Sequence, residues 1–247
     1  MKNYRKIGIS ALAGSLAMFS VNADIGISGS SELTYTSGSG SFGSNSVNGN
    51  PFAMSHDINI TGTGELDNGF AYSVNTNFAG QDMAQDSSIF KLDMGDLGTV
   101  GFDQGSGAFG ISTLENKVPT AYEEADHGVG TLGHGIDAVG NTNVLGYSNT
   151  LAGVGISLQY NPDISTQTMN QAGSTNGAGS TGSNWNGALS MAVPGVDGMT
   201  LAVGYSDTDN DGTVTDNSEV TAALNYTMGS VSVGYQQSSV NNNGGST

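Results

Sequence analysis

The chain has 247 residues, 39 glycines and no cysteine, and only 11% of its residues are charged. Five basic residues stand against 22 acidic ones. This balance argues against nucleic acid as a partner, because phosphate binding depends on Lys and Arg. No Walker, Rossmann, zinc or nucleophile-elbow motif occurs, so we predict that the protein is not an enzyme.

The first 23 residues have the organisation of a secretory signal peptide. A basic start with Lys2, Arg5 and Lys6 precedes a short apolar run over residues 7–19, and Val21-Asn22-Ala23 forms a small-x-Ala cleavage site. The run is shorter than the roughly 20 residues that a membrane helix needs. We therefore predict a signal peptide over 1–23 and a single mature domain over 24–247. The mature chain then has two lysines, no arginine and 22 acidic residues, which gives a net charge of −20.

Apolar residues recur at every second position between Ile25 and Tyr235. Period-two alternation predicts strands with one apolar and one polar face. We predict eleven strands, over residues 25–35, 56–66, 70–78, 88–94, 99–103, 143–149, 154–160, 184–193, 200–206, 219–227 and 230–236.

The predicted connections alternate in length along the chain. Turn sequences such as Leu66-Asp67-Asn68-Gly69 follow the even-numbered strands, whereas longer polar segments follow the odd-numbered ones, the longest being 104–143. Short turns on one side and long loops on the other are typical of a transmembrane β-barrel. The fold class we expect is therefore all-β, an antiparallel up-and-down transmembrane β-barrel.

The polar faces of the strands carry most of their charged residues. A charge on a lipid-facing position costs roughly 2–4 kcal/mol near the bilayer midplane. We therefore expect these residues to face a water-filled lumen, and they are Glu32, Asp57, Glu65, Lys91, Asp93, Asp103 and Glu219.

Aromatic residues end several apolar faces close to the long connections. They are Tyr35, Phe78, Phe102, Tyr160, Trp185, Tyr205 and Tyr235. Amphipathic rings at these places are typical of a membrane-interface belt. Strands favour aromatic residues in any protein, so that simpler explanation stays open.

Three local motifs occur in a characteristic order. The export signal leads into a Gly/Ser-rich first strand, Asp24-Ile25-Gly26-Ile27-Ser28-Gly29; the stretch ITGTGELDNGF covers residues 60–70; and MGDLGTVGF covers residues 94–102. The second stretch is similar to the second hairpin of Gram-negative general porins, and the third resembles the turn and fifth strand before their constriction loop. The longest connection also falls between strands five and six, as in that family. The whole chain thus resembles a general porin of the trimeric porin superfamily.

This resemblance implies a sixteen-stranded outer-membrane barrel, a homotrimer, and a long loop that folds inward and narrows the pore. The sequence departs from the family in three ways. We count eleven strands, the chain ends in Gly-Gly-Ser-Thr instead of a terminal aromatic residue, and the predicted mature chain has no arginine for a basic pore wall. The first two departures predict a C-terminally truncated sequence. For the third, either the arginines lie in the missing strands or the pore is uniformly acidic.

The long connection over 104–143 is the candidate pore constriction. Its charged residues are Glu115, Lys117, Glu123, Glu124, Asp126 and Asp137. In a narrow opening this excess of carboxylates would favour cations. An ordinary solvated loop is the alternative. His127 and His134 lie in the same segment but have no metal-ligand spacing.

The loop after the ninth predicted strand contains D-x-D-x-D-G, with Asp207, Asp209 and Asp211. This spacing resembles a calcium-binding loop, although Ser218 stands where the twelfth-position Glu is expected. The three aspartates are a candidate Ca²⁺ site, and an acidic β-turn is the alternative. The sequence suggests no other cofactor.

Two functions from different classes fit these observations. The first is an outer-membrane channel for passive diffusion of small hydrophilic solutes and ions, biased toward cations. The alternative is a non-conducting cell-surface β-protein, adhesive or structural, with an acidic Ca²⁺-binding loop. The partners implied by the first are small solutes, cations, outer-membrane lipid and further copies of the chain.

Overall fold

The structure is a computed structural model that describes residues 24–35, 41–42, 45–46, 52–80, 82–115, 117–119, 142–162, 182–209 and 216–243. The predicted signal peptide lies outside these residues. Almost every described element is a strand, and the two helices are short 3₁₀ turns. In the described part of the chain no helix is long and apolar enough to cross a membrane.

Eleven strands form one large sheet. They are β1 (Asp24–Tyr35), β4 (Phe52–Glu65), β5 (Ala71–Ala79), β6 (Ala84–Asp93), β7 (Thr99–Gln104), β8 (Thr142–Leu151), β9 (Val154–Asn161), β10 (Ser183–Ala192), β11 (Met199–Asp209), β12 (Asp216–Met228) and β13 (Val231–Asn243). A separate small hairpin consists of β2 (Ser41–Phe42) and β3 (Asn45–Ser46). The 3₁₀ turns are η1 (Gly95–Leu97) and η2 (Gly110–Leu114).

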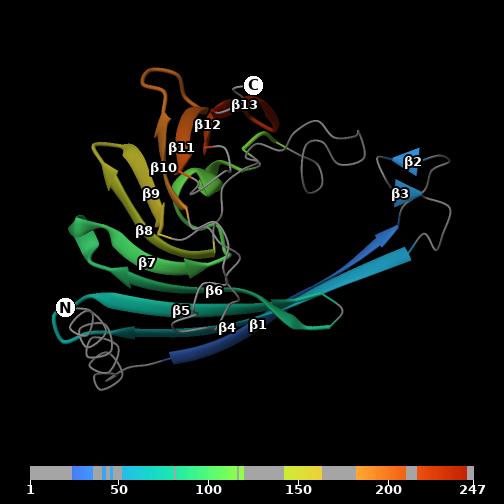
Figure 1. Cartoon of the computed structure of the whole chain (residues 1–247), viewed down its shortest axis with the longest axis vertical. Coiled ribbons are helices and arrows are strands. Elements are labelled where there is room, and N and C mark those ends of the chain that lie inside the picture. Colours follow the sequence, from blue (N-terminus) through green and yellow to red (C-terminus); the bar gives the residue numbers. More distant parts are fainter. Residues whose placement is uncertain are drawn as a thin grey trace.

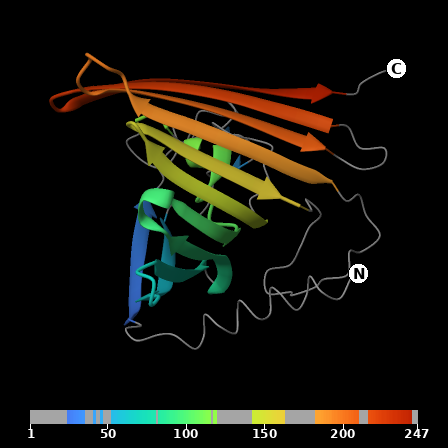
Figure 2. The ribbon, with the colours of Figure 1, turned by 90° about the vertical axis from the view of Figure 1, so that its left-hand side faces the viewer.

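Each strand of the large sheet pairs antiparallel with the next one in the chain, so the topology is purely up-and-down. The sheet curls into an open trough, with β1 and β13 at its two ends (Figures 1 and 2). The longest connection in the sheet joins its fifth strand, β7, to its sixth, β8. The prediction of eleven antiparallel up-and-down strands with a long loop between the fifth and sixth is confirmed. The expected count of sixteen strands stays a prediction.

Several strands extend further toward the long connections than the sequence pattern predicted. β11 continues to Asp209 and β13 to Asn243, and polar pairs such as Thr208↔Asn217 and Asp216↔Asn243 continue the ladder. Backbone pairing needs no apolar side chain, so a strand can continue beyond the last residue of its apolar alternation. The same effect shortens the connection between β5 and β6 to residues 80–83, so our prediction of a longer loop there was wrong.

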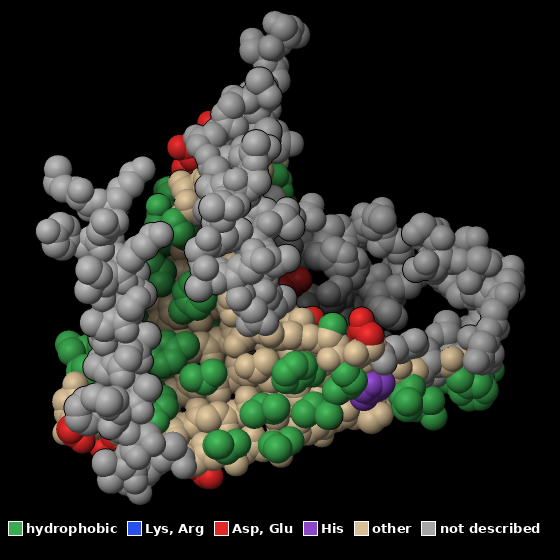
Figure 3. Space-filling model, turned by 60° about the horizontal axis from the view of Figure 1, so that its bottom comes forward, with side chains coloured by type: hydrophobic (Ala, Val, Ile, Leu, Met, Phe, Trp, Pro, Cys, Tyr) green, Lys and Arg blue, Asp and Glu red, His purple; other side chains and the backbone are tan. Residues whose placement is uncertain are grey.

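The convex face of the sheet is apolar and open. Pairing places Phe102, Leu145, Tyr160 and Trp185 in one row across β7 to β10, and these side chains are between 39% and 56% exposed. Rings also meet in pairs on this face, with 5.3 Å between the centroids of Trp185 and Tyr205. The view from below shows hydrophobic side chains in rows over the underside of the sheet (Figure 3).

The concave face is mostly polar, and part of it is buried. Among the described residues, Ser87, Asn161, Asn184, Asn186, Ser206, Thr208 and Thr221 are buried there, and so are the carboxylates of Asp103 and Glu219. The few buried apolar side chains are Ile89, Phe109, Ile111, Leu114, Val144, Ala188, Ala202 and Ala223. The inside of the trough is therefore not an ordinary apolar core.

The short turns depend on glycines with positive φ, which a residue with a Cβ adopts only at a cost. Gly98 closes the turn between β6 and β7 with φ 87° and ψ −170°, a region that is essentially limited to glycine. A Cβ there would also lie 2.5 Å from the carbonyl oxygen of Ser148. Gly69, in the turn after β4, has φ 83° but has open space around it.

These two glycines form a matched pair for measuring the effect of backbone crowding. Gly98→Ala should lower the free energy of unfolding by about 1–3 kcal/mol more than Gly69→Ala, since only the first adds a steric clash to the strained dihedral. Chemical unfolding of the refolded protein in detergent micelles measures both. Equal losses would contradict the close approach of Gly98 to β8.

Candidate functional site

The chain segment after β7 turns inward and lies across the concave face. Its helical turn η2 contacts β9, β10, β11 and β12. The described part of this connection comprises residues 105–115 and 117–119. We call residues 104–119 the docked segment.

The docked segment begins at a buried carboxylate. Asp103 is fully buried, and its two oxygens accept hydrogen bonds from the backbone N–H groups of Ser106 (2.8 Å) and Ala108 (3.0 Å). Gly105 and Gly107 both have positive φ, so the backbone can turn sharply around this carboxylate. Hydrogen bonds to a charged acceptor are among the stronger ones in proteins. Asp103 thus fixes the direction in which the segment leaves β7.

Apolar side chains of the docked segment pack on inward-facing glycines of the wall. Phe109, which is 1% exposed, lies over Gly101 and Gly146, and a Cβ on Gly101 would lie 2.6 Å from the Cζ atom of that ring. Ile111 and Leu114 lie over Gly204 in the same way, at 2.6 Å and 2.9 Å. The glycines therefore form a floor into which the segment fits, and a side chain there would displace it.

Polar contacts hold the backbone of η2 against the wall. The N–H of Gly110 donates to Ser157 Oγ (2.8 Å), and that of Ile111 donates to Asn186 Oδ1 (2.8 Å). Asn186 Nδ2 donates in turn to Asn184 Oδ1 (2.7 Å). Asn184 Nδ2 then reaches the hydroxyls of Ser206 and Thr208, at 2.8 Å and 2.7 Å. This buried relay satisfies groups that would otherwise lose their hydrogen bonds on burial.

The far end of the docked segment is tied to the last two strands of the sheet. Gln236 Nε2 donates to the carbonyl oxygen of Leu114 (2.7 Å), and Gln236 Oε1 accepts from the N–H of Lys117 (3.1 Å). Asn225 Nδ2 donates to the carbonyl oxygen of Lys117 (2.6 Å). The segment therefore spans the concave face from β7 to β13.

Only part of the predicted constriction falls within the described residues. Glu115 and Lys117 lie on the docked segment, and both are exposed. Glu123, Glu124, Asp126 and Asp137 lie outside the described residues, as do His127 and His134.

Strand pairing places the predicted lumen-facing residues on the concave side of the sheet. Asp57 accepts a hydrogen bond from Ser30 Oγ (3.3 Å), and Asp93 accepts one from the N–H of Gly95 (2.9 Å). Glu32 and Glu65 are exposed. Lys91 Nζ lies 5.8 Å from the ring centroid of Phe109, a distance typical of a cation–π contact.

Two of the predicted lumen-facing carboxylates do not meet water. Asp103 is 0% exposed and Glu219 is 1% exposed. The alternation of side chains along a strand predicts their face, but it cannot show that the docked segment covers Asp103.

Sequence reasoning missed the residues that hold the docked segment. Asn184, Asn186, Gly101, Gly146 and Gly204 are not among the site residues that the sequence predicts. A signal was present, because all three glycines occupy polar-face positions, where no lipid contact explains a missing side chain.

The acidic loop cannot be assembled into a metal site from the described residues. Asp207 and Asp209 lie at the end of β11, whereas Asp211 lies outside the described residues. Within the part that the structure describes, no three His, Asp or Glu side chains come together as metal ligands. The Ca²⁺ site stays a prediction.

Comparison with known proteins gives one family. A model of the Gram-negative porin family matches residues 9–247. Among solved structures, the chain is similar to a triple mutant of Rhodopseudomonas blastica porin, with 16% identity and a TM-score of 0.47 over 90% of this chain and 85% of that one. A second mutant of the same porin has 16% identity and a TM-score of 0.46 over the same shares. A search of curated proteins by sequence found no match.

The glycine floor can be tested with trypsin, because Lys91 and Lys117 are the only Lys or Arg residues after residue 23. Gly146→Ala places a methyl group into the ring of Phe109. Overpacking of this kind costs about 1–3 kcal/mol, so cleavage after Lys117 should become about tenfold faster. Cleavage after Lys91, within β6, reports unfolding of the sheet itself.

Gly62→Ala is the matched control, since a Cβ at Gly62 has nothing within 4 Å. Its cleavage rate after Lys117 should equal that of the unmodified protein. If Gly146→Ala is cleaved no faster than Gly62→Ala, the glycine floor does not hold the segment.

Proposed function

The chain belongs to the Gram-negative porin family, and on this premise we propose that it forms a water-filled outer-membrane channel for passive diffusion of small hydrophilic solutes and ions, biased toward cations. The observation that carries the proposal is the docked segment. It lies on the polar concave face and is fixed at both ends and in the middle. A segment held in this way would narrow a water-filled lumen at a constant width.

The charge distribution supports the cation bias. The accessible concave carboxylates, Glu32, Asp57, Glu65 and Asp93, lie on β1, β4 and β6. Carboxylates that line a water-filled opening raise the local concentration of cations. Glu115, Glu123, Glu124, Asp126 and Asp137 belong to the same proposal as the acidic side of the constriction.

Export and assembly complete the proposal. Residues 1–23 would act as the signal peptide that directs export, and residues 24–247 as barrel wall. The convex face, with its rows of half-exposed apolar and aromatic side chains, suits contact with lipid. The homotrimer that the family resemblance implies stays a prediction.

Ion selectivity tests the charge argument. The triple variant Asp57→Asn, Glu65→Gln, Asp93→Asn removes three concave carboxylates and keeps their size and hydrogen-bonding oxygens. Its cation-to-anion permeability ratio should fall by about twofold or more, because lumen carboxylates set the local potential. Reversal potentials of the protein in planar bilayers under a KCl gradient measure this ratio.

A control variant with the same change in net charge is available. Asp67→Asn, Asp96→Asn, Asp197→Asn removes three exposed carboxylates from the short turns, and the ratio should change much less. An anion-preferring channel would refute the cation bias. A correctly assembled protein with no conductance would favour the non-conducting surface protein.

Neighbouring residues of β10 test which face meets lipid. Leu189 is on the convex face and 46% exposed, whereas Ser190 is exposed on the concave face. Leu189→Arg should reduce the folded fraction in the outer membrane strongly, because a midplane charge on the lipid face costs about 2–4 kcal/mol. Ser190→Arg should assemble normally. Heat-modifiable mobility on gels measures the folded fraction, and equal assembly of both variants would contradict the assignment of faces.

A further inference from the structure

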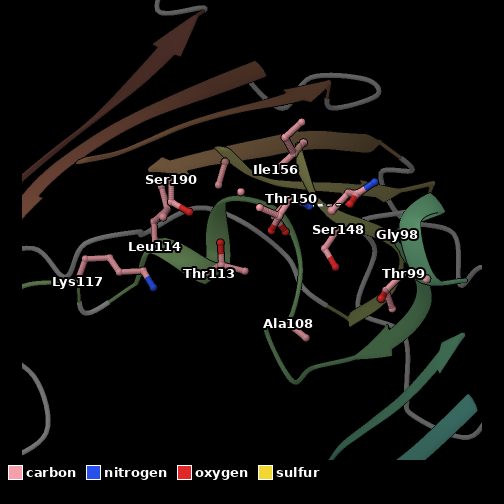
Figure 4. A pocket seen from close by; sticks show the side chains of 15 residues that line it. Gly98, Thr99, Ala108, Thr113, Leu114, Lys117, Ser148, Thr150, Ile156 and Ser190 are labelled. Carbon is pink, nitrogen blue, oxygen red and sulfur yellow. Dashed lines mark hydrogen bonds between the residues drawn. The ribbon is translucent and has the colours of Figure 1, made fainter. Parts of the chain in front are cut away.

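A pocket lies between the docked segment and the wall, on the side of the short turns. It has a volume of about 510 Å³, within the range of sites for small molecules. Residues of β7 to β10 form one side of the pocket, and Thr113, Leu114 and Lys117 of the docked segment form the other side (Figure 4).

The wall of this pocket offers hydroxyl groups in regular rows. Strand pairing places Thr99, Ser148 and Ser157 side by side on β7, β8 and β9. Thr150 and Ser190 lie on either side of Gly155 in the next row. Neighbouring strands are about 4.8 Å apart, so three strands span roughly 10 Å, a length that suits a solute of five or six carbons.

Most of these hydroxyls are available to a solute. Among the described residues, the hydroxyls of Thr99, Ser148, Thr150 and Ser190 have no hydrogen-bond partner. Ser157 Oγ accepts from the N–H of Gly110 and keeps its own proton to donate. A hydroxyl can both donate and accept, so this surface complements a solute that carries several hydroxyls.

Among the described residues, one ammonium group and no carboxylate complete the lining. The side chain of Lys117 extends along the pocket toward Thr113 (Figure 4), and within the described part of the chain its ammonium forms no ion pair. On the concave face of β7 to β12, Asp103 and Glu219 are the carboxylates that the structure describes, and both are buried. Within the described residues, this pocket therefore offers a negative group an ammonium that no carboxylate pairs.

We infer that the pocket is a subsite for a small polyhydroxylated solute with one carboxylate, of the sugar-acid class. The hydroxyl rows would bind the hydroxylated carbons, and Lys117 would pair with the carboxylate. This inference rests on the proposed channel function, because the pocket faces the lumen. It is compatible with a cation bias, since the accessible acids of the wall lie on β1, β4 and β6, and at 0.15 M salt charges are screened over about 8 Å.

Current recordings with the protein in planar bilayers test the subsite. Sodium gluconate and glucose are added separately, each at equal osmolality, and partial block of the KCl current is titrated. Gluconate should block in a saturable way and at lower concentration than glucose. In Lys117→Gln the half-blocking concentration of gluconate should rise by about threefold to tenfold, as expected for an exposed ion pair, while that of glucose stays unchanged.

Three further variants separate the contribution of the Lys117 charge from that of the pocket hydroxyls. Lys117→Arg keeps the charge and should keep the gluconate preference. Ser148→Ala with Ser190→Ala should weaken block by both solutes. Thr200→Ala removes a hydroxyl of the concave face outside the pocket and should change neither titration.

The outcomes distinguish this inference from the proposed function. Normal KCl conductance with equal block by gluconate and glucose, or with a gluconate block that Lys117→Gln leaves intact, would overturn the sugar-acid subsite and keep the channel. Absence of conductance would refute the channel. Calorimetric titration of gluconate into the folded protein in detergent then tests the pocket by itself, and heat that Lys117→Gln does not reduce would overturn the subsite.

Discussion

The backbone ladder of the large sheet is the interaction on which the rest of the structure depends. A soluble protein of this size would enclose an apolar core, but here most large apolar side chains lie on the convex face, and the trough holds few of them. Antiparallel pairing from β1 through β13 satisfies the backbone groups that lipid cannot satisfy. Because side chains alternate, the same ladder divides every strand into a lipid-compatible face and a polar face. Strand pairing thus creates both surfaces at once.

The docked segment packs on a face that is mostly polar. A loop lying on a layer of hydroxyls and amides has few apolar surfaces to bury, so it needs both shape and hydrogen bonds. Gly101, Gly146 and Gly204 supply the shape by leaving room for Phe109, Ile111 and Leu114. Asp103 and the relay through Asn186 supply the hydrogen bonds. Burial of each polar group costs little free energy because the group is hydrogen-bonded. Together these contacts hold the segment at a fixed distance from the wall.

Charge is distributed unevenly over the concave face. The accessible acids of the wall lie on the early strands, while the later strands present amides and hydroxyls and bury the two carboxylates that the structure describes there. A lumen bordered by both parts would offer ions an acidic side and offer hydroxylated solutes a neutral side. The docked segment lies over the neutral side, where its backbone finds uncharged partners such as Ser157 and Gln236. General ion selectivity and recognition of a particular solute can therefore reside on different parts of one wall.

The sequence by itself determined the strands, their two faces, the short turns and the position of the long loop, because each of these follows from local alternation and from turn residues such as Gly69 and Gly98. It also placed Asp103 on the polar face. Only the tertiary structure decided what covers that face. Phe109 meets Gly146, Ile111 meets Asn186 and Lys117 meets Gln236 across 37, 75 and 119 residues, and no local pattern encodes such pairings. They arise because the curvature of the whole sheet brings β9 to β13 beneath a loop that leaves β7. The role of a glycine or an asparagine in the wall is therefore visible only once the residue that packs against it is known.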